Sequence, residues 1–153
     1  MVLEKEVNEL EALMPFYNVK NSNVSSRGVD WHIDHCLKII TGVSDLLRSS
    51  NPDDYKWKFN VTRFYVFIKG AIPRGKAKAP KAVNNKEEIL LKDLESQLTE
   101  VKNKISGLEN LPAKANFKHL YFGCINRDET IKFLTIHTNH HLKIMRDIID
   151  ASK

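Results

Sequence analysis

Residues 126–150, NRDETIKFLTIHTNHHLKIMRDIID, are the stretch from which the fold can be read most directly. Asn126 followed three positions later by Glu129 is typical of a capping box, which marks the start of a helix. From there to residue 150, apolar and histidine side chains recur every three or four residues. The resulting stripe collects Leu134, His137, His141, Met145 and Ile148. The stretch is therefore predicted to be a long amphipathic helix whose stripe faces a core.

Four earlier segments are also predicted to be helical, so the expected fold class is all-α. They cover residues 2–14, 29–47, 60–70 and 84–108. The aromatic and β-branched composition of residues 60–70 would also allow a strand, but the helical neighbours favour a helix. The last of the four carries a leucine-rich seam that suits an antiparallel bundle. The sequence thus predicts one domain over residues 1–153, a four-helix bundle with a short extra N-terminal helix.

Two stretches between these helices, residues 69–81 and 112–123, are expected to be loops. The first, KGAIPRGKAKAPK, holds five of the 24 basic residues and no acidic one. The rest of the chain has 19 basic and 19 acidic residues, so the net charge of +5 belongs to this loop. Nucleic-acid binders usually carry a broader basic surface, and no nucleic-acid partner is expected. The loop is either simply solvated or binds a small anion through Arg74, Lys76 and Lys78.

Composition places the chain among ordinary soluble proteins. Hydrophobic residues make up 42% and charged residues 28% of the 153 residues, which is usual for a globular domain. No apolar run approaches the roughly 20 residues of a membrane helix, and the N-terminus lacks the pattern of a signal peptide. Cys36 and Cys124 form no C-x-x-C pair and are expected to be reduced thiols. We therefore expect a cytoplasmic protein with no membrane partner.

Five of the six histidines fall into two clusters, and this clustering suggests a metal site. One cluster is WHIDHC, with His32 and His35, and the other is HTNHH, with His137, His140 and His141. Histidines at positions i and i+4 share one helix face and can reach one ion. Zinc and similar metals accept neutral imidazole nitrogens. The inward-facing pair His137 and His141 is thus a candidate metal-ligand pair, with His140 flanking it.

Helical spacing leaves the third ligand open, because His32 and His35 both lie within the apolar arc of their helix. An H-x-x-x-H match on a helix is also frequent by chance, so the histidines could equally pair with each other or with other buried polar groups. The sequence contains no H-E-x-x-H and no E-x-x-H, which disfavours a zincin-type protease and a ferritin-like di-iron site.

Three segments together carry a family resemblance: WHIDHCLKII, IPRGKAKAPKAV and FKHLYFGCINRDETIKFLTIHTNHHLKI. In this order they resemble the DinB-like superfamily, specifically a branch described as a domain of unknown function. The resemblance implies a four-helix bundle of up-down-down-up topology and a divalent metal, often nickel or zinc, held by three histidines. Carried onto this chain, it implies His35, His137 and His141 as the ligands. It leaves His32 and His140 as neighbours or alternative ligands.

This chain departs from the family pattern at two positions. Leu120 stands where many relatives have proline, and Ile144 stands where many have glutamine, three residues after the last histidine. The second change removes a possible polar neighbour of the site.

Three functions are compatible with these features. The resemblance implies a metal-dependent enzyme, either a thiol S-transferase or a hydrolase, whose substrate is a small molecule such as a low-molecular-weight thiol. Thiol transfer fits better than hydrolysis, because no acidic residue is clearly placed as a general base; Asp34 falls on the polar arc of its helix. The alternatives are a non-catalytic stress-response or small-anion binding protein, and a bundle with a vestigial or empty metal site. A homodimer is also plausible, through the helix that begins near Lys86 or the aromatic run Phe64-Tyr65-Phe67.

Overall fold

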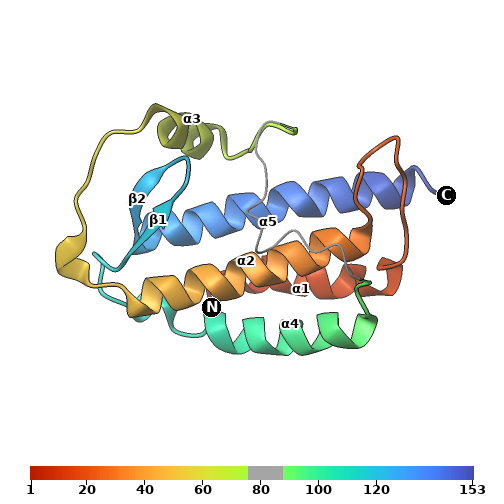
Figure 1. Ribbon diagram of the computed structural model, residues 1–153, viewed down its shortest axis with the longest axis horizontal. Helices are drawn as coiled ribbons and strands as arrows, with labels where there is room; N and C mark the ends of the chain where they lie inside the picture. The colour runs from red at the N-terminus through yellow and green to blue at the C-terminus, as the bar shows by residue number, and fades with distance from the viewer. Residues whose placement is uncertain (76–87) are drawn as a thin grey trace.

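The computed structural model describes residues 1–75 and 88–153, and this part of the chain is mainly helical (Figure 1). The mainly helical composition expected from the sequence is confirmed, while the two short strands were not expected. The α-helices are α1 (Glu4–Leu13), α2 (Val29–Ser49), α3 (Val61–Lys69), α4 (Leu91–Ile105) and α5 (Arg127–Asp150), and the strands are β1 (Asn116–His119) and β2 (Gly123–Asn126).

Local signals explain where the two best-defined helices begin. The Asn126 side chain accepts a hydrogen bond from the Glu129 backbone, and the Glu129 carboxylate accepts one from the Asn126 backbone. The capping box predicted for α5 is therefore confirmed. The Asn60 side chain caps α3 by accepting one hydrogen bond from the Arg63 N–H, and Gly70 ends this helix with a φ of 62°. Glycine adopts this left-handed conformation without the steric cost of a Cβ atom.

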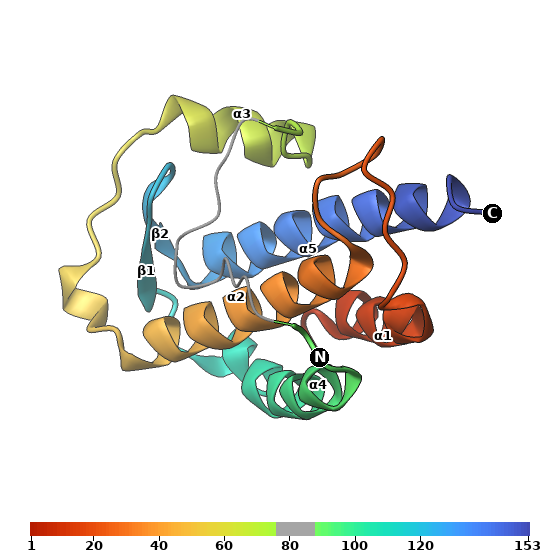
Figure 2. The same cartoon turned by 45° about the vertical axis from the view of Figure 1, so that its right-hand side comes forward.

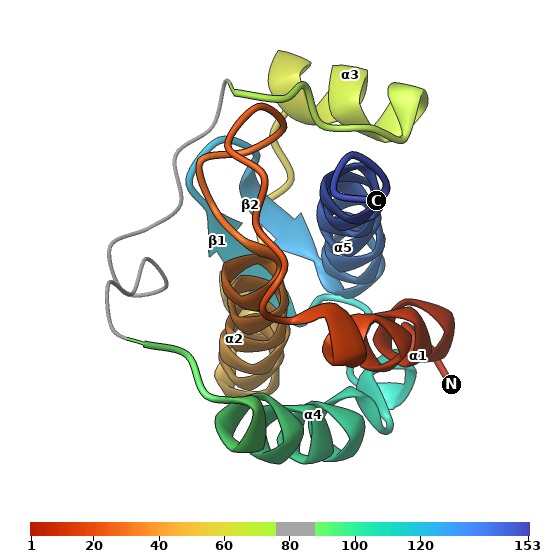
Figure 3. The ribbon, with the colours of Figure 1, turned by 90° about the vertical axis from the view of Figure 1, so that its right-hand side faces the viewer.

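Helices α1, α2, α4 and α5 pack together as one group. Helix α2 packs against α4 on one side and α5 on the other, and α1 contacts both α4 and α5. Figure 1 shows α1 and α5 running in one direction and α2 and α4 in the opposite one. The end-on view in Figure 3 shows these four helices grouped together, with α3 outside the group.

The position of α3 differs from the expectation. The sequence predicts that residues 60–70 form a principal helix of the bundle, whereas α3 lies above the hairpin and α5 (Figure 2). Only Arg63 and Val66 of this helix are buried. The N-terminal helix α1, expected to be an extra, instead buries Val7 and Leu10 completely against α4 and α5. A nine-residue helix with two buried side chains contributes little hydrophobic stabilisation.

The hairpin replaces part of the loop expected at residues 112–123. Strands β1 and β2 pair antiparallel, with Phe117 opposite Ile125 and His119 opposite Gly123. The intervening three residues form a short hairpin loop, and Gly123 has a φ of 73° directly after it. Three-residue loops followed by a left-handed residue are a common hairpin type. Gly123 was the one residue in this stretch that could have indicated a hairpin. The mixed polar and aromatic residues around it do not show the alternation of apolar and polar side chains that is typical of strands.

None of the helices in residues 1–75 and 88–153 is long and apolar enough to cross a membrane. Cys36 is buried and Cys124 is partly buried, and both are free thiols. Burial raises the pKa of the Cys36 thiol well above its ordinary value, so this thiol is a structural side chain rather than a nucleophile.

Candidate metal centre

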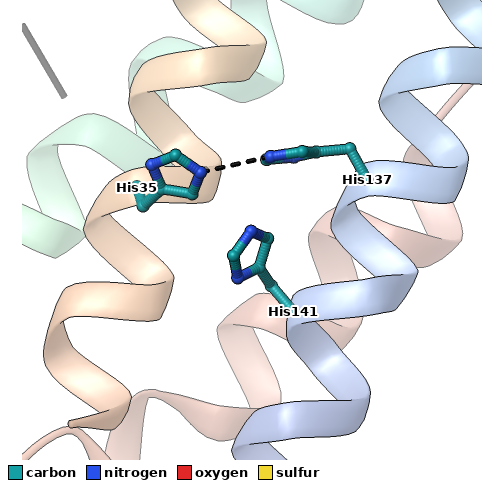
Figure 4. Close-up of side chains that lie close together, drawn as sticks. All are labelled: His35, His137 and His141. Carbon is teal, nitrogen blue, oxygen red and sulfur yellow. Dashed lines mark hydrogen bonds between the residues drawn. The ribbon is translucent and has the colours of Figure 1, made fainter. Parts of the chain in front are cut away.

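Three histidines from two antiparallel helices meet between α2 and α5. His35 projects from α2, while His137 and His141 project from successive turns of α5 (Figure 4). One ring nitrogen from each of the three lies within 4.8 Å of the others. His35 and His141 are buried and His137 is half-buried. The structure thus brings together the three residues that could hold one metal ion.

The spacing and chemistry of these nitrogens fit a divalent ion. The Nε2 atoms of His35 and His137 are 3.1 Å apart. Two imidazole nitrogens bound tetrahedrally at about 2.0–2.1 Å from one zinc ion would lie roughly 3.3–3.4 Å apart. A small side-chain movement therefore accommodates an ion between them. In Figure 4 one nitrogen of the His141 ring points toward the gap between the other two rings.

His32 occupies a neighbouring position and contacts the triad through His141. Its Nδ1 is 2.9 Å from Nδ1 of His141, and its Nε2 is 3.1 Å from the Ser25 hydroxyl. Because Nδ1 of His141 is engaged in this way, Nε2 is the nitrogen that remains available to an ion. Outer partners of this type fix the orientation and tautomer of a metal-binding imidazole. Of the two histidines that helical spacing left open, His35 lies within 4.8 Å of both His137 and His141, whereas His32 contacts His141 from the side.

Burial favours the neutral form of His32, His137 and His141, which is the protonation state that a metal requires of its histidine ligands. Removal from water, reinforced by the charge of neighbouring histidines, lowers the pKa of His32 to about 3. The pKa values of His137 and His141 are lowered well below the ordinary value by the same two causes. Desolvation disfavours the charged imidazolium, so at neutral pH the cluster offers unprotonated nitrogens as ligands.

Trp31 adds a rigid wall that the sequence analysis did not single out. Its ring stacks on His35 with centroids 4.7 Å apart and planes 7° from parallel. The next residue, His32, meets the same indole edge-on at 5.1 Å. Stacking restricts the rotation of His35 and directs its Nε2 toward α5. The position of Trp31 directly before His32 in the WHIDHC motif was the feature of the sequence that could have predicted this role.

A cavity of about 520 Å³ opens directly onto the three histidines. Its volume is within the range of small-molecule binding sites. Its wall is formed by α2, α3, α5 and the hairpin, and it is predominantly apolar and aromatic. The lining residues near the triad include Trp31, Ile39, Val66, Ile72, Phe122 and Phe133, and two further histidines, His119 and His140.

His119 belongs to the strand pair and was not a predicted site residue. Its Nδ1 accepts hydrogen bonds from the Tyr121 and Phe122 backbone, both at 3.1 Å. Burial lowers its pKa to about 4. The sequence offered no periodic signal for this residue, because its place beside the triad depends on the pairing of β1 with β2.

The other residues predicted for the site, His140 and the three basic residues of the loop, are not part of the triad. His140 lines the cavity, and burial lowers its pKa, with a smaller contribution from the nearby Arg74 charge. Arg74, a predicted anion contact, pairs with Asp147 at 2.5 Å on the surface. Lys76 and Lys78 lie outside the described residues.

The two departures from the family pattern also have defined places. Leu120 is exposed at the tip of the hairpin, with 78% of its surface accessible, and Ile144 is buried in the core. Ile144 therefore contributes packing where a glutamine would place an amide.

No known protein family, curated protein or solved structure matches this chain. The resemblance to the DinB-like superfamily consequently rests on the three sequence segments alone.

Proposed function

We propose that this protein is a metal-dependent thiol S-transferase that uses His35, His137 and His141 to hold a divalent ion. The observation that carries the proposal is the meeting of three imidazoles at the wall of an apolar cavity of about 520 Å³. Three protein ligands leave coordination positions open for an exogenous group. The cavity supplies the space in which a second, apolar substrate can approach that group.

The donor set favours zinc or nickel, because neutral imidazoles suit borderline divalent metals better than the hard cations magnesium and calcium. Such an ion, when bound, lowers the pKa of a coordinated thiol and holds it as a thiolate. The protein's own residues then have defined tasks. His32 holds the His141 ring, Trp31 holds the His35 ring, and the aromatic wall excludes water from the reacting atoms.

The residue types that line the cavity favour thiol transfer over hydrolysis. Among the described residues that line the cavity, none is aspartate or glutamate. Activation of water generally needs a base within hydrogen-bond reach. Asp34 points to the other side of α2, where it binds Lys38 and Gln97. A metal-bound thiolate needs no such base, so the lack of a carboxylate among the described lining residues disfavours carboxylate-assisted hydrolysis more than it does thiol transfer.

We also propose a distant DinB-like relationship for the fold. In chain order, the directions of α1, α2, α4 and α5 are up, down, down and up (Figure 1). The order agrees with the topology that the resemblance implies, provided that α1 counts as the first helix of the bundle and α3 as the insertion.

A second candidate is a small-molecule binding protein without catalysis. It is favoured by the pairing of His35 with His137 and of His32 with His141, because each pair satisfies ring nitrogens without an ion. An anion-binding version is less well supported, since Asp147 already neutralises Arg74.

The test combines metal analysis with a conjugation assay. Wild-type protein and the His137→Ala/His141→Ala double variant are purified, mildly chelated, reloaded with zinc or nickel, and analysed for bound metal. We expect about one ion per wild-type chain and almost none in the double variant. The proposed site fails if both proteins retain the same small amount.

The assay then supplies a benzyl halide and several cellular thiols to the loaded proteins. Metal-dependent formation of the thioether is expected only in the wild type. The control is Asp34→Asn, which alters a buried polar residue on the opposite side of α2. If the wild type holds metal but conjugates no thiol, the binding candidate replaces the enzyme.

A further inference from the structure

His119 is held in one tautomer by the turn of the hairpin. Two backbone N–H groups, those of Tyr121 and Phe122, point at its Nδ1 from 3.1 Å each. A backbone N–H can only donate a hydrogen bond. Nδ1 must therefore be the unprotonated nitrogen, and the ring proton of the neutral imidazole must be on Nε2.

The Nε2–H group of His119 is a hydrogen-bond donor without an assigned acceptor. Within residues 1–75 and 88–153, no hydrogen bond from this group is present, whereas Nδ1 makes two. Burial lowers the pKa of the ring to about 4, so the ring is neutral near pH 7 and keeps one proton. An imidazole of this kind acts as a fixed neutral donor rather than as a cation.

Aromatic packing directs this donor and places it beside the triad. The imidazole stacks on Phe122 with centroids 4.2 Å apart, and the edge of Phe133 meets it at 4.5 Å. Phe133 in turn contacts His137, with centroids 5.5 Å apart. His119 and His137 line the same cavity. The cavity is therefore lined by the three candidate ligands from α2 and α5 and, on the hairpin side, by His119 in a fixed tautomer.

We propose that His119 donates this hydrogen bond to the carbonyl oxygen of an apolar, α,β-unsaturated carbonyl substrate. The inference rests on the proposed thiol transfer and names its electrophile. An aromatic wall suits an apolar body, and one fixed donor suits one acceptor atom. Carbonyl compounds conjugated to a double bond combine an electrophilic carbon with that acceptor.

The reaction balances without any further reagent. The thiol loses its proton and its sulfur forms a bond to the β-carbon of the substrate. The π electrons of the carbon–carbon double bond move to give an enolate, whose negative charge lies on the oxygen that His119 binds. The released proton then adds to the α-carbon, so the product is the simple thiol adduct. A donor aimed at a developing oxyanion stabilises this transition state more than the ground state.

Two substitutions of the same residue separate a catalytic role from a structural one. The side-chain oxygen in His119→Asn lies near the original Nδ1 and can still accept the turn N–H groups, but the Nε2–H donor is lost. The amide in His119→Gln reaches the original Nε2 position and can donate, but the turn contacts are lost. The two variants thus remove opposite halves of the imidazole.

The first measurement compares two electrophiles in zinc- or nickel-loaded protein. One is an aryl-substituted unsaturated ketone, and the other is a benzyl halide without an acceptor oxygen. In His119→Asn we expect the kcat/KM ratio of ketone to halide to fall roughly 100-fold, the effect of removing one oxyanion donor. His119→Gln should recover much of the ratio while melting at a lower temperature. An unchanged ratio in His119→Asn would overturn the proposal.

The second measurement needs neither metal nor turnover, so it separates failure of this inference from failure of the proposed function. Binding of a saturated aryl ketone and of the hydrocarbon of the same shape is followed by tryptophan fluorescence, to which Trp31 at the cavity wall contributes. The wild type should prefer the ketone by roughly 5- to 10-fold, as expected for one net hydrogen bond, and His119→Asn should lose that preference. Equal affinity of both probes for the wild type contradicts the donor role, as does an NMR spectrum that places the ring proton on Nδ1.

Discussion

Helix α2 buries polar side chains on two opposite sides, and the two sides are organised differently. Toward α4, the Asp34 carboxylate accepts hydrogen bonds from Lys38 at 2.7 Å and from Gln97 at 2.9 Å. Toward α5, His32 and His35 each place one ring nitrogen against a histidine of α5: Nδ1 of His32 faces Nδ1 of His141, and Nε2 of His35 faces Nε2 of His137. On the α4 side a carboxylate is paired with an ammonium group and an amide donor, whereas on the α5 side only imidazole rings meet one another.

The difference indicates which side is structural and which is a site. A buried polar group that is fully paired stabilises a single packing arrangement. A cluster of neutral bases has no intrinsic partner of opposite charge, because neither member of a histidine pair supplies one. Only the second cluster opens onto the cavity. We therefore expect perturbations of the histidine side to depend on pH and metal, and those of the Asp34 side to depend on neither.

The largest effect is expected from acid. The folded-state pKa values of His32 and His119, about 3 and about 4, lie below the unfolded value of 6.5. Their stabilising contributions are therefore complete above pH 6.5 and are lost as the pH falls toward the folded values. Between pH 7.5 and 4.5 each should reduce the free energy of unfolding by roughly 2–3 kcal/mol. Denaturant titrations over this pH range measure the loss.

His32→Asn sharpens that experiment, because it removes one of the buried rings whose pKa is lowered on folding. The variant should show a shallower loss of stability in acid than the wild type. A wild-type stability that stays constant from pH 7.5 to 4.5 would contradict the burial of neutral histidines.

The next effect is stabilisation by metal. At a free zinc or nickel concentration one hundred times the dissociation constant, binding should add about 2.7 kcal/mol to the stability of the folded wild type. His137→Ala/His141→Ala should show no such gain. Thermal unfolding with and without added metal provides the measurement. A gain of equal size in the double variant would assign the binding to other residues.

The sequence predicted the histidine side of α2 more completely than the Asp34 side or the hairpin, because most of the histidine side is defined by local sequence. The capping box of α5 and the spacing of His137 and His141 are local properties, so residues 126–150 contain the information. The choice between His32 and His35 depends on how α2 is rotated against α5, and helical periodicity does not encode that rotation. It came from the resemblance, and the structure shows His35 facing the pair.

Features that depend on contacts between distant segments were predicted wrongly or missed. Asp34 was placed on the polar arc, yet α4 covers it and leaves it 2% exposed, because Gln97 and Lys38 satisfy its carboxylate there. His119 was missed because its position is defined by the pairing of two strands across a three-residue turn. Residues 60–70 form a helix as predicted, but their amphipathic pattern did not reveal that most of them remain exposed.

A smaller effect is expected on the Asp34 side. Asp34→Ala removes the acceptor that Gln97 and Lys38 share, and should cost about 2 kcal/mol of stability through the unpaired Gln97 amide. The loss should be the same with and without metal, and the metal content should match that of the wild type. A reduced metal content in this variant would show that the two sides of α2 are coupled and would weaken their separation.

The smallest effect is expected for Lys38→Met, which removes the charge from the same cluster but keeps a flexible apolar chain. The Lys38 side chain is 29% exposed, and it pairs with Asp34 within one helix turn. Water still solvates the Lys38 ammonium group and weakens its attraction to the carboxylate, so we expect the charge to contribute less than the Gln97 hydrogen bond. Gln97 continues to donate to the carboxylate, so denaturant titration should detect a loss well below that of Asp34→Ala. A loss as large as that of Asp34→Ala would mean that the ammonium, and not the Gln97 amide, is the main partner of the buried carboxylate. The Asp34 side would then be held by an ion pair whose strength depends on salt. The two sides of α2 would then differ because one is charged and the other is not, rather than because one is fully hydrogen-bonded.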